Sequence, residues 1–258
     1  MFFCSNEFME EVRTTPPERL DRALVTRGLV SSRARGEALI RDGGVAVNGV
    51  IVMSKSFLVG TADLVTLLKG DLEWVSRAAL KLASALEHWQ IDPKGKVALD
   101  IGASTGGFTE VLLSRGAQKV YALDVGHGQL ATKLLASTKV VNMESVHIKD
   151  VSVKDFAEPI DMIVVDVSFI SLEKVLPKAK ALLHAGGILI ALIKPQFEVG
   201  KEHVGKGVVT DPKLHASVVD RIKECATALG FAVEGVIASP ILGGDGNKEF
   251  LLYTNLTH

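Results

Sequence analysis

The sequence predicts an α/β protein in which a small α+β module precedes a mostly parallel sheet of seven strands. From about residue 77 onward, strand-like apolar runs alternate with helix-like segments, the pattern of a parallel sheet with crossover helices. A glycine-rich turn follows the first of these strands, as it does in folds that bind nucleotide cofactors. Ahead of them, two short helical patterns and a hairpin signal indicate a separate, smaller domain.

The length of 258 residues is enough for a small module and a domain of typical size. We expect a flexible arm over residues 1–17, a small domain over 18–69, a linker over 70–76 and a large domain over 77–258. The arm is polar and has no apolar period, which disfavours a regular element there.

The small domain is expected to start with a helix over residues 18–27, which Gly28 ends. A second helix follows, with Ser31 or Ser32 as its N-cap and several arginines on its polar side. Two β-prone runs then flank Asn48-Gly49, the strongest short signal for a hairpin.

In the large domain, apolar runs predict seven strands and the segments between them predict five helices. The strands are expected over residues 97–100, 119–124, 140–143, 162–166, 188–193, 232–238 and 250–254. The helices are expected over residues 77–88, 108–115, 128–136, 171–183 and 212–229.

Composition excludes several classes of protein. A net charge of −1 argues against a uniformly basic nucleic-acid binder, although residues 12–60 carry eight basic and four acidic side chains. Cys4 and Cys225 are too few and too far apart for a disulfide framework or a metal cluster, so we expect no metal. The start of the chain lacks the pattern of a secretory signal, and no run of about 18 apolar residues occurs, which predicts a cytoplasmic protein.

The glycine-rich turn spans Asp100 to Phe108 and suits close approach of a ligand to the backbone. Asp124 ends the second strand, where its carboxylate can accept both hydroxyls of a bound ribose. NAD and S-adenosylmethionine both use such a carboxylate. The turn lacks the Gly-x-Gly-x-x-Gly pattern that cradles a pyrophosphate and is similar to the Asp-x-Gly-x-x-x-Gly of methyltransferases, so we expect S-adenosylmethionine.

The small domain resembles the S4 RNA-binding module. The resemblance rests on Arg19-Leu-Asp21, Ser32-Arg33, Leu39-Ile40 and the run from Val45 to Gly49. It implies an α+β module that binds RNA phosphates through arginines: Arg19, Arg22, Arg33, Arg35 and Arg41. On composition alone, Arg33, Arg35 and Arg41 could equally form the solvated face of a small domain.

The large domain resembles the FtsJ-like RNA 2′-O-methyltransferases, a Rossmann-like fold whose Lys-Asp-Lys-Glu tetrad matches Lys81, Asp166, Lys194 and Glu249. The match is closer to the hemolysin A (TlyA) branch, which joins an S4 module to this domain and shares Ser168-Phe-Ile-Ser-Leu172 and Lys194-Pro-Gln-Phe-Glu-Val-Gly200. Together with the turn, this resemblance implies ten residues that bind S-adenosylmethionine: Asp100, Gly102, Ala103, Ser104, Gly106, Gly107, Phe108, Asp124, Glu144 and Asp166.

The chemistry explains why such residues are needed. A ribose hydroxyl is a weak nucleophile and must be aligned behind the methyl group, so positioning and proton removal govern the rate. Lys194 could take the proton, although a lysine amine ordinarily titrates near 10.4. It could instead act as a charged donor that orients the hydroxyl.

The resemblance implies an enzyme that methylates a cytidine of large-subunit ribosomal RNA, as naked RNA or in a subunit. We expect no membrane partner and a monomer. Two departures stand out. The branch has an Asn and an Arg after the third strand, where this chain has Val146-His-Ile-Lys149. The chain also stops soon after its last strand, without the extension of members that modify both subunits, which favours the large subunit alone. The alternatives are a non-catalytic ribosome-assembly factor and a membrane-active cytolysin.

Overall fold

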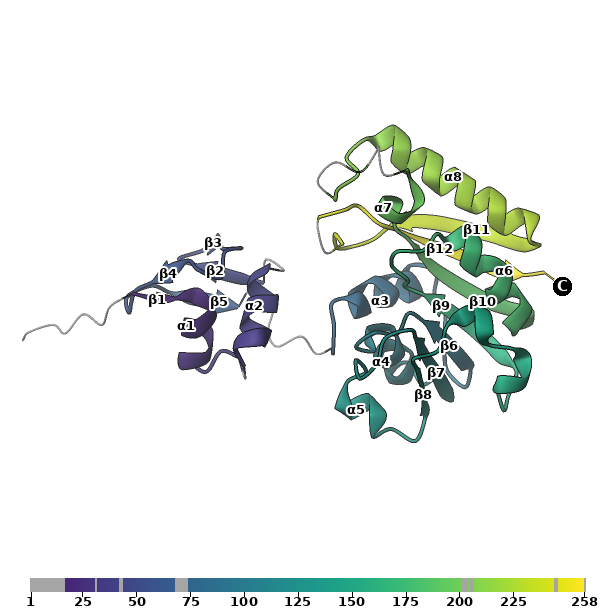
Figure 1. The fold of residues 1–258 in the computed structure, drawn as a ribbon, viewed down its shortest axis with the longest axis horizontal. Coiled ribbons are helices and arrows are strands. Elements are labelled where there is room, and N and C mark those ends of the chain that lie inside the picture. Colours follow the sequence, from purple (N-terminus) through teal and green to yellow (C-terminus); the bar gives the residue numbers. More distant parts are fainter. Residues whose placement is uncertain are drawn as a thin grey trace, which may run out of the picture. The chain divides into compact units, whose positions relative to one another are not determined.

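The computed structural model describes residues 17–30, 32–41, 44–67, 74–200, 204, 207–243 and 246–257. The chain divides into two compact units, residues 1–73 and residues 74–258. Figure 1 labels their helices and strands. Residues 1–16 of the expected arm, with Cys4, lie outside the described residues, as do the alternative cap Ser31 and residues 70–73 of the expected linker.

Within its described residues, the first unit contains two short helices and two small sheets. Its elements are β1 (Glu18–Arg19), α1 (Leu20–Thr26), α2 (Arg33–Arg41), β2 (Val45–Val47), β3 (Val50–Ile51), β4 (Leu58–Val59) and β5 (Val65–Leu67). Strand β2 lies between β3 and β5, and both pairings are antiparallel. The first helix starts two residues later than expected, because Glu18 and Arg19 pair with β4 instead.

Local sequence signals explain the other boundaries of this unit. Asn48 and Gly49 have φ angles of 51° and 81°, so the expected hairpin turn is confirmed. The Ser32 hydroxyl accepts a hydrogen bond from the backbone N–H of Arg35 at 3.3 Å, which caps α2 as expected. Aliphatic side chains from both helices and the strands form one core, among them Leu20, Leu24, Ile40, Val45 and Val59.

The second unit is an α/β domain built on a seven-stranded sheet. Its strands are β6 (Val97–Ile101), β7 (Lys119–Asp124), β8 (Val140–Glu144), β9 (Ile160–Val165), β10 (Leu183–Ile193), β11 (Phe231–Ala238) and β12 (Phe250–Leu256). Its helices are α3 (Ala78–His88), α4 (Gly107–Ser114), α5 (Thr132–Leu135), α6 (Leu172–Leu182), α7 (Pro195–Glu198) and α8 (Pro212–Ala228), with two 3₁₀ turns at Ile148–Asp150 and Val153–Asp155.

The strand order is β11-β12-β10-β9-β6-β7-β8. The pairings from β8 to β10 are parallel, whereas β12 is antiparallel to both of its neighbours. All seven strands were expected, and the predicted fold class is confirmed: a Rossmann-like, mostly parallel sheet preceded by an α+β module.

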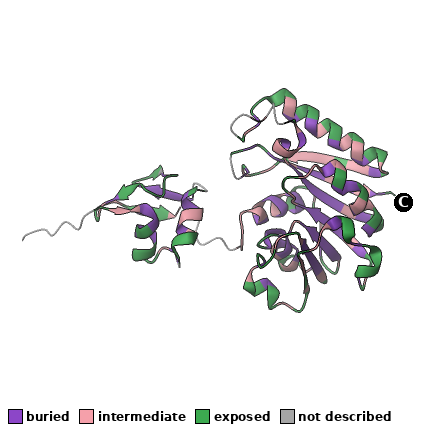
Figure 2. Ribbon diagram, viewed as in Figure 1, coloured by how far each residue is buried: buried purple, intermediate pink, exposed green. Residues whose placement is uncertain are grey.

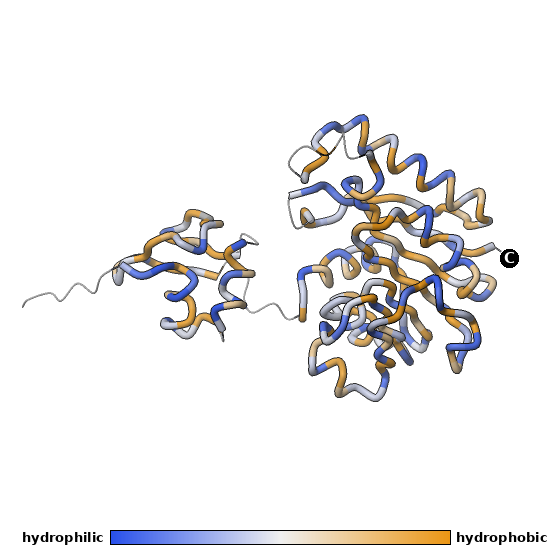
Figure 3. Tube along the Cα trace, viewed as in Figure 1, coloured by the Kyte–Doolittle hydropathy of each residue, from blue (hydrophilic) through white to orange (hydrophobic). Residues whose placement is uncertain are grey.

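Helices cover both faces of this sheet. Met162 and Val164 of β9 pack in a cluster with residues of α3 and α4, whereas Ile163 and Val165 pack with residues of α6 and α8. This alternation follows from the two-residue period of a strand. Figure 2 shows the central strands buried between helices whose outer sides are exposed, and Figure 3 shows the same strands as the most hydrophobic part of the domain.

Helix α5 is shorter than the expected segment of residues 128–136. The backbone N–H groups of Gln129 and Leu130 donate to the carboxylate of Glu144, and Gly128 has a φ of 65°, so the chain before Thr132 follows a loop. Strand β10 is longer than expected, because it begins at Leu183 directly after α6.

Candidate active site

The predicted tetrad lies where several strands of the sheet end or begin. Strands β6, β9 and β10 are parallel neighbours, with Ile101 opposite Val165 and Val165 opposite Ala191. Strand β12 runs the other way, with Phe250 opposite Ile193. Asp166 and Lys194 directly follow their strands and Glu249 directly precedes its own, so the sheet brings three of the four residues to one edge.

The four side chains form two ion pairs. The Lys81 Nζ is 2.6 Å from Glu249 Oε2, and the Lys194 Nζ is 2.6 Å from Asp166 Oδ1. Lys194 also donates to the Ser168 hydroxyl at 3.0 Å. Sequence reasoning identified the four residues but did not predict which lysine pairs with which carboxylate.

Burial makes these pairings matter energetically. Lys81 reaches the edge from α3 with a side chain that is 10% exposed, and the side chain of Glu249 is 3% exposed. A charge removed from water to this extent is tolerated only when it is paired. The Gln196 amide adds a donor to Glu249 Oε1 at 3.3 Å, so Glu249 holds both Lys81 and the segment that follows Lys194.

The glycine-rich turn packs directly against Asp166. A Cβ on Gly102 would overlap the carbonyl oxygen of Asp166, and the φ of Gly102 is 87°. A Cβ on Gly107 would overlap the Ser76 hydroxyl, because the start of α4 lies against the start of α3. Glycine at these two positions therefore allows the turn to approach both Asp166 and the helix that carries Lys81.

Asp124 stabilises the same turn from the end of β7. Its Oδ2 accepts from the backbone N–H of Ser104 at 2.8 Å, and its Oδ1 accepts from that of Gly126 at 2.7 Å. A carboxylate has about four acceptor sites, so two remain for the hydroxyls of a ligand.

Asp100 is a fully buried carboxylate behind the turn. The Thr109 hydroxyl donates to its Oδ2 at 2.7 Å, whereas Oδ1 has no hydrogen-bond partner. Burial raises the pKa of Asp100 to about 7, although the hydrogen bond from Thr109 opposes that shift. An unpaired buried oxygen beside a glycine-rich turn is a feature expected where a polar ligand group binds.

A cavity of about 930 Å³ opens beside the turn and beside Asp166, which is the member of the tetrad in its lining. Four of the predicted cofactor-binding residues line it: Gly102, Ser104, Asp124 and Asp166. The other six are not among the lining residues: Asp100, Ala103, Gly106, Gly107, Phe108 and Glu144. Of these six, Asp100, Ala103 and Phe108 are buried. A volume of this size suits a ligand as large as a nucleoside cofactor.

Glu144 supports this cavity from outside its lining. It accepts from the Asn142 amide at 2.9 Å and from the backbone of Gln129 and Leu130. The Asn142 contact, followed by the backbone contacts, lowers the pKa of Glu144 to about 2. The carboxylate thus fixes the loop that carries Gln129, which itself lines the cavity.

Sequence reasoning gave no role to several other lining residues. Ser168, Phe169 and Phe197 belong to the two segments that carried the family resemblance, and all three line the cavity. Gln129 lines it as well and carries no sequence signal. His147, in the segment that departs from the expected Asn and Arg, lines the cavity, and its Nδ1 accepts from the backbone of Lys149 at 3.1 Å.

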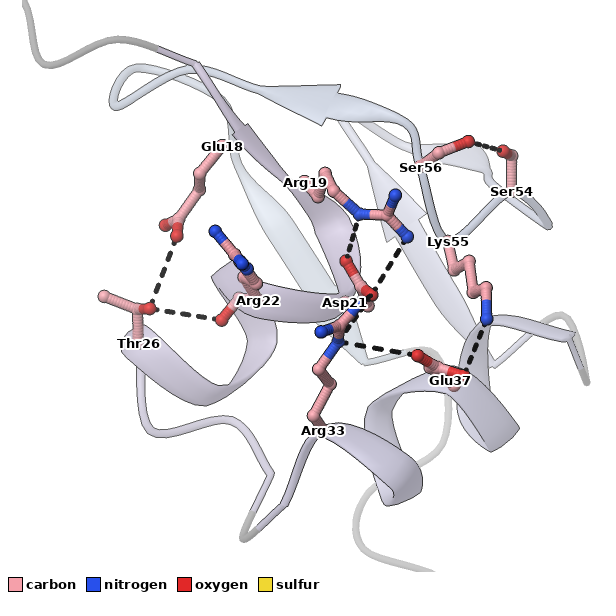
Figure 4. A network of polar contacts seen from close by, with 10 residues as sticks. All are labelled: Glu18, Arg19, Asp21, Arg22, Thr26, Arg33, Glu37, Ser54, Lys55 and Ser56. Carbon is pink, nitrogen blue, oxygen red and sulfur yellow. Dashed lines mark hydrogen bonds and ion pairs between the residues drawn. The ribbon is translucent and has the colours of Figure 1, made fainter.

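Two of the five predicted RNA-binding arginines converge on Asp21 in the first unit (Figure 4). Arg19 donates to both oxygens of Asp21, at 3.0 and 3.2 Å, and the Arg33 Nη2 is 2.7 Å from Oδ2. The carboxylate is fully buried, and the hydrogen bond from Arg19 is the main reason that its pKa falls to about 2. The side chains of Arg19 and Arg33 are 37% and 49% exposed, so Asp21 orders them while part of each side chain stays accessible.

The remaining arginines of this unit differ in their surroundings. Arg22 and Arg41 are exposed, and Arg35 is half-buried. Arg27, outside the predicted set, donates to the backbone carbonyls of Asp63 and Gly60 at 2.7 and 2.8 Å, so it ties the end of α1 to a turn.

Comparison with protein families matches both units. A model described as FtsJ-like methyltransferase matches residues 74–256, and a model described as S4 domain matches residues 18–65. In the part of the chain that the structure describes, no helix has the length and apolar character needed to cross a membrane.

Three curated relatives are similar over most of the chain. The 16S/23S rRNA (cytidine-2′-O)-methyltransferase TlyA of Mycobacterium tuberculosis is 43% identical and covers 91% of this chain and 88% of its own length. Hemolysin A of Brachyspira hyodysenteriae is 39% identical over 91% of this chain and 98% of its own length. The 23S rRNA (cytidine-2′-O)-methyltransferase TlyA of Campylobacter jejuni is 42% identical over 70% of each chain.

One solved structure resembles the chain in sequence and fold, and another resembles it in fold alone. A protein from Streptococcus thermophilus with the provisional name hemolysin has a TM-score of 0.75 and 38% identity, and covers 94% of this chain and 89% of its own. An S-adenosylmethionine dependent methyltransferase from Mesorhizobium loti has a TM-score of 0.50 and 14% identity over 67% of this chain and 96% of its own, so it shares the fold alone.

Proposed function

This chain belongs to the FtsJ-like methyltransferases and, with its S4 domain, to their hemolysin A (TlyA) branch, and from that membership we propose its substrate and site residues. It methylates the 2′-hydroxyl of a cytidine in large-subunit ribosomal RNA. The observation that carries the proposal is the double ion pair of Lys81 with Glu249 and Lys194 with Asp166 at one edge of the sheet, where Asp166 lines the cavity.

The names of the relatives support the choice of substrate. Those from Mycobacterium tuberculosis and Campylobacter jejuni are both named as cytidine-2′-O-methyltransferases, and 23S RNA appears in both names. The large subunit is the target that the two have in common. Since the proposed substrate is ribosomal RNA, we also propose that the protein acts in the cytoplasm.

The cavity fits S-adenosylmethionine in size and in its polar groups. Asp124 offers free acceptor sites to the ribose hydroxyls, and the unpaired Oδ1 of Asp100 lies behind the turn. Gly102 keeps the turn open beside Asp166. When bound, S-adenosylmethionine supplies a methyl group on a positively charged sulfur. We assign its binding to the turn residues with Asp124 and Asp166, and we assign Glu144 to the supporting loop.

Lys194 acts on the ribose hydroxyl. The carboxylate of Asp166, as an ion-pair partner, and the hydroxyl of Ser168, as a hydrogen-bond acceptor, hold its Nζ from two directions. A contact with a carboxylate suits an ammonium group, so Lys194 orients the hydroxyl as a charged donor and the proton is lost after methyl transfer. Lys81 and Glu249 maintain this edge, because Glu249 also holds Gln196 two residues beyond Lys194.

The S4 domain binds the RNA backbone. Five arginines make the phosphate contacts: Arg19, Arg22, Arg33, Arg35 and Arg41. Such contacts supply affinity that falls with salt and read little sequence. The binding domain comprises residues 18–69, the linker residues 70–76 and the catalytic domain residues 77–258, and the chain acts as a monomer.

Methyl transfer tests the proposal. Purified protein is incubated with radiolabelled S-adenosylmethionine and either naked ribosomal RNA or large subunits from cells that lack the modification. Label in a 2′-O-methylcytidine of the large-subunit RNA, absent with Lys194→Ala, supports the assignment. Measurable cofactor binding without transfer to either substrate contradicts it and favours a ribosome-assembly factor.

A further inference from the structure

We infer that Glu198 is a positioning residue of this site, an inference that rests on the function proposed above. The segment Lys194–Glu198 holds the loop of residues 166–172 at both of its ends. Lys194 holds the first end and Glu198 the second, so Glu198 fixes Asp166 and Lys194 relative to each other without contacting the substrate.

The second end of the loop is tied by two hydrogen bonds to one carboxylate. The Ser171 hydroxyl donates to Glu198 Oε2 at 2.7 Å, and the backbone N–H of Leu172 donates to Oε1 at 2.8 Å. Leu172 is the first residue of α6, so Glu198 occupies the N-terminal end of that helix, where a negative charge is favoured. The side chain of Glu198 is only 2% exposed, so these contacts are held inside the protein.

The first end and the middle of the loop are held by the same segment. Lys194 contacts Asp166 and Ser168, as described for the tetrad. Between the two ends, the rings of Phe169 and Phe197 lie tilted at 50° to each other with centroids 4.9 Å apart. The loop is therefore held at both ends by one segment of five residues, with a ring contact between them.

The loop requires such attachment because its own conformation is unfavourable. Phe169 has a φ of 64°, a left-handed value that a residue with a bulky side chain rarely adopts. Its side chain is also exposed, with 91% of the residue surface accessible, so burial of the ring does not stabilise the loop. A backbone conformation of this kind persists only where its surroundings hold it.

Arg221 of α8 anchors Glu198 in turn. Its Nη2 donates to the backbone carbonyl of Glu198 at 2.6 Å and lies 3.6 Å from Oε2, while its Nε contacts Glu173 at 3.1 Å. Burial raises the pKa of Glu198, and the hydrogen bonds from Leu172 and Ser171 oppose that shift. The buried carboxylate is thus retained by specific partners rather than by solvent.

The test compares Glu198→Gln, Glu198→Ala and a matched control, Glu173→Gln. The control removes a carboxylate that contacts the same arginine but neither end of the loop. Single-turnover methyl transfer from radiolabelled S-adenosylmethionine to large subunits that lack the modification is measured at a temperature where circular dichroism shows every variant folded. Calorimetry gives the cofactor affinity separately.

A positioning role predicts a graded loss of rate. Glutamine keeps one acceptor oxygen, so Glu198→Gln should react about tenfold more slowly, and Glu198→Ala on the order of 100-fold more slowly, because small misplacements of reacting groups cost this much. In both variants the rate should fall by more than the cofactor affinity falls. Glu173→Gln should stay within about twofold of the wild type.

The role of Glu198 and the proposed function are refuted by different results. A folded Glu198→Gln protein that reacts at the wild-type rate refutes the role of Glu198 alone, as does a rate loss matched by Glu173→Gln. If Glu198→Ala does not fold, the comparison of the two glutamine variants decides. A wild-type protein that transfers no methyl group refutes the proposed function itself.

Discussion

Lys81 and Glu249 form a buried ion pair between a helix and the residue before β12, and its removal makes a quantitative prediction. The Nζ and Oε2 atoms are 2.6 Å apart, and the side chains are 10% and 3% exposed. With an effective dielectric constant of about 20, charges at this distance attract by about 6 kcal/mol, most of which offsets their desolvation. Lys81→Met leaves Glu249 buried without its partner, which should cost about 3–5 kcal/mol.

The assay is thermal and urea denaturation followed by tryptophan fluorescence. The chain has two tryptophans, Trp74 and Trp89, both in the second unit, and Trp89 packs against Tyr253 of β12 at 5.3 Å between ring centroids. The signal therefore reports the unit that contains the pair. A loss of this size should lower its Tm by about 6–20 °C, given about 2–4 °C for each kcal/mol in a domain of this length.

The double variant Lys81→Met/Glu249→Gln provides the control. It removes both charges together, so it should be more stable than Lys81→Met alone by at least about 1 kcal/mol. Additive losses in the double variant, or a Lys81→Met protein within about 0.5 kcal/mol of the wild type, would show that the two side chains are not coupled as the structure indicates.

Three further predictions concern the other contacts. The pKa of Asp21 is lowered to about 2, chiefly by the hydrogen bond from Arg19, so the contribution of the charged carboxylate to stability is complete above about pH 4 and is lost as the pH falls through about 2. Thermal melts by circular dichroism over this range should show the loss, and Asp21→Asn should show a smaller one, to which Glu144 still contributes because its pKa is also lowered to about 2. Gly102→Ala places a Cβ on the carbonyl oxygen of Asp166 at a left-handed φ, so calorimetry should find at least about tenfold weaker binding of S-adenosylmethionine, and unchanged binding would refute the close approach. Arg33→Ala should weaken binding to ribosomal RNA and reduce the slope of log affinity against log salt by about 1, whereas an unchanged slope would remove Arg33 from the phosphate contacts.

Much of the fold was predictable because its local signals agree with its packing. Asn48-Gly49 forms the expected hairpin, and the apolar runs before Asp124, Asp166 and Lys194 are the buried strands that they suggested. The shortened helix α5 was not predictable, since the residues before it form a loop whose backbone N–H groups donate to Glu144, a residue of strand β8.

The pairing within the tetrad also depends on long-range structure. The antiparallel insertion of β12 between β10 and β11 brings Phe250 opposite Ile193, and this register places Glu249 at the same edge as Lys194. No local pattern in the sequence specifies that register. Glu198 was overlooked for the same reason, because its partners at Ser171 and Leu172 are distant in the chain.

The most direct test of the central claim is the amount of 2′-O-methylcytidine, measured by nucleoside mass spectrometry, in large-subunit RNA treated with wild type or Lys194→Ala. Calorimetry on both proteins establishes whether they bind S-adenosylmethionine equally. One new 2′-O-methylcytidine is expected with the wild type and none with Lys194→Ala at equal cofactor affinity. Equal methylation by the two proteins, or a methyl group on a base instead of a ribose, would contradict the assignment of the paired residues as the catalytic centre.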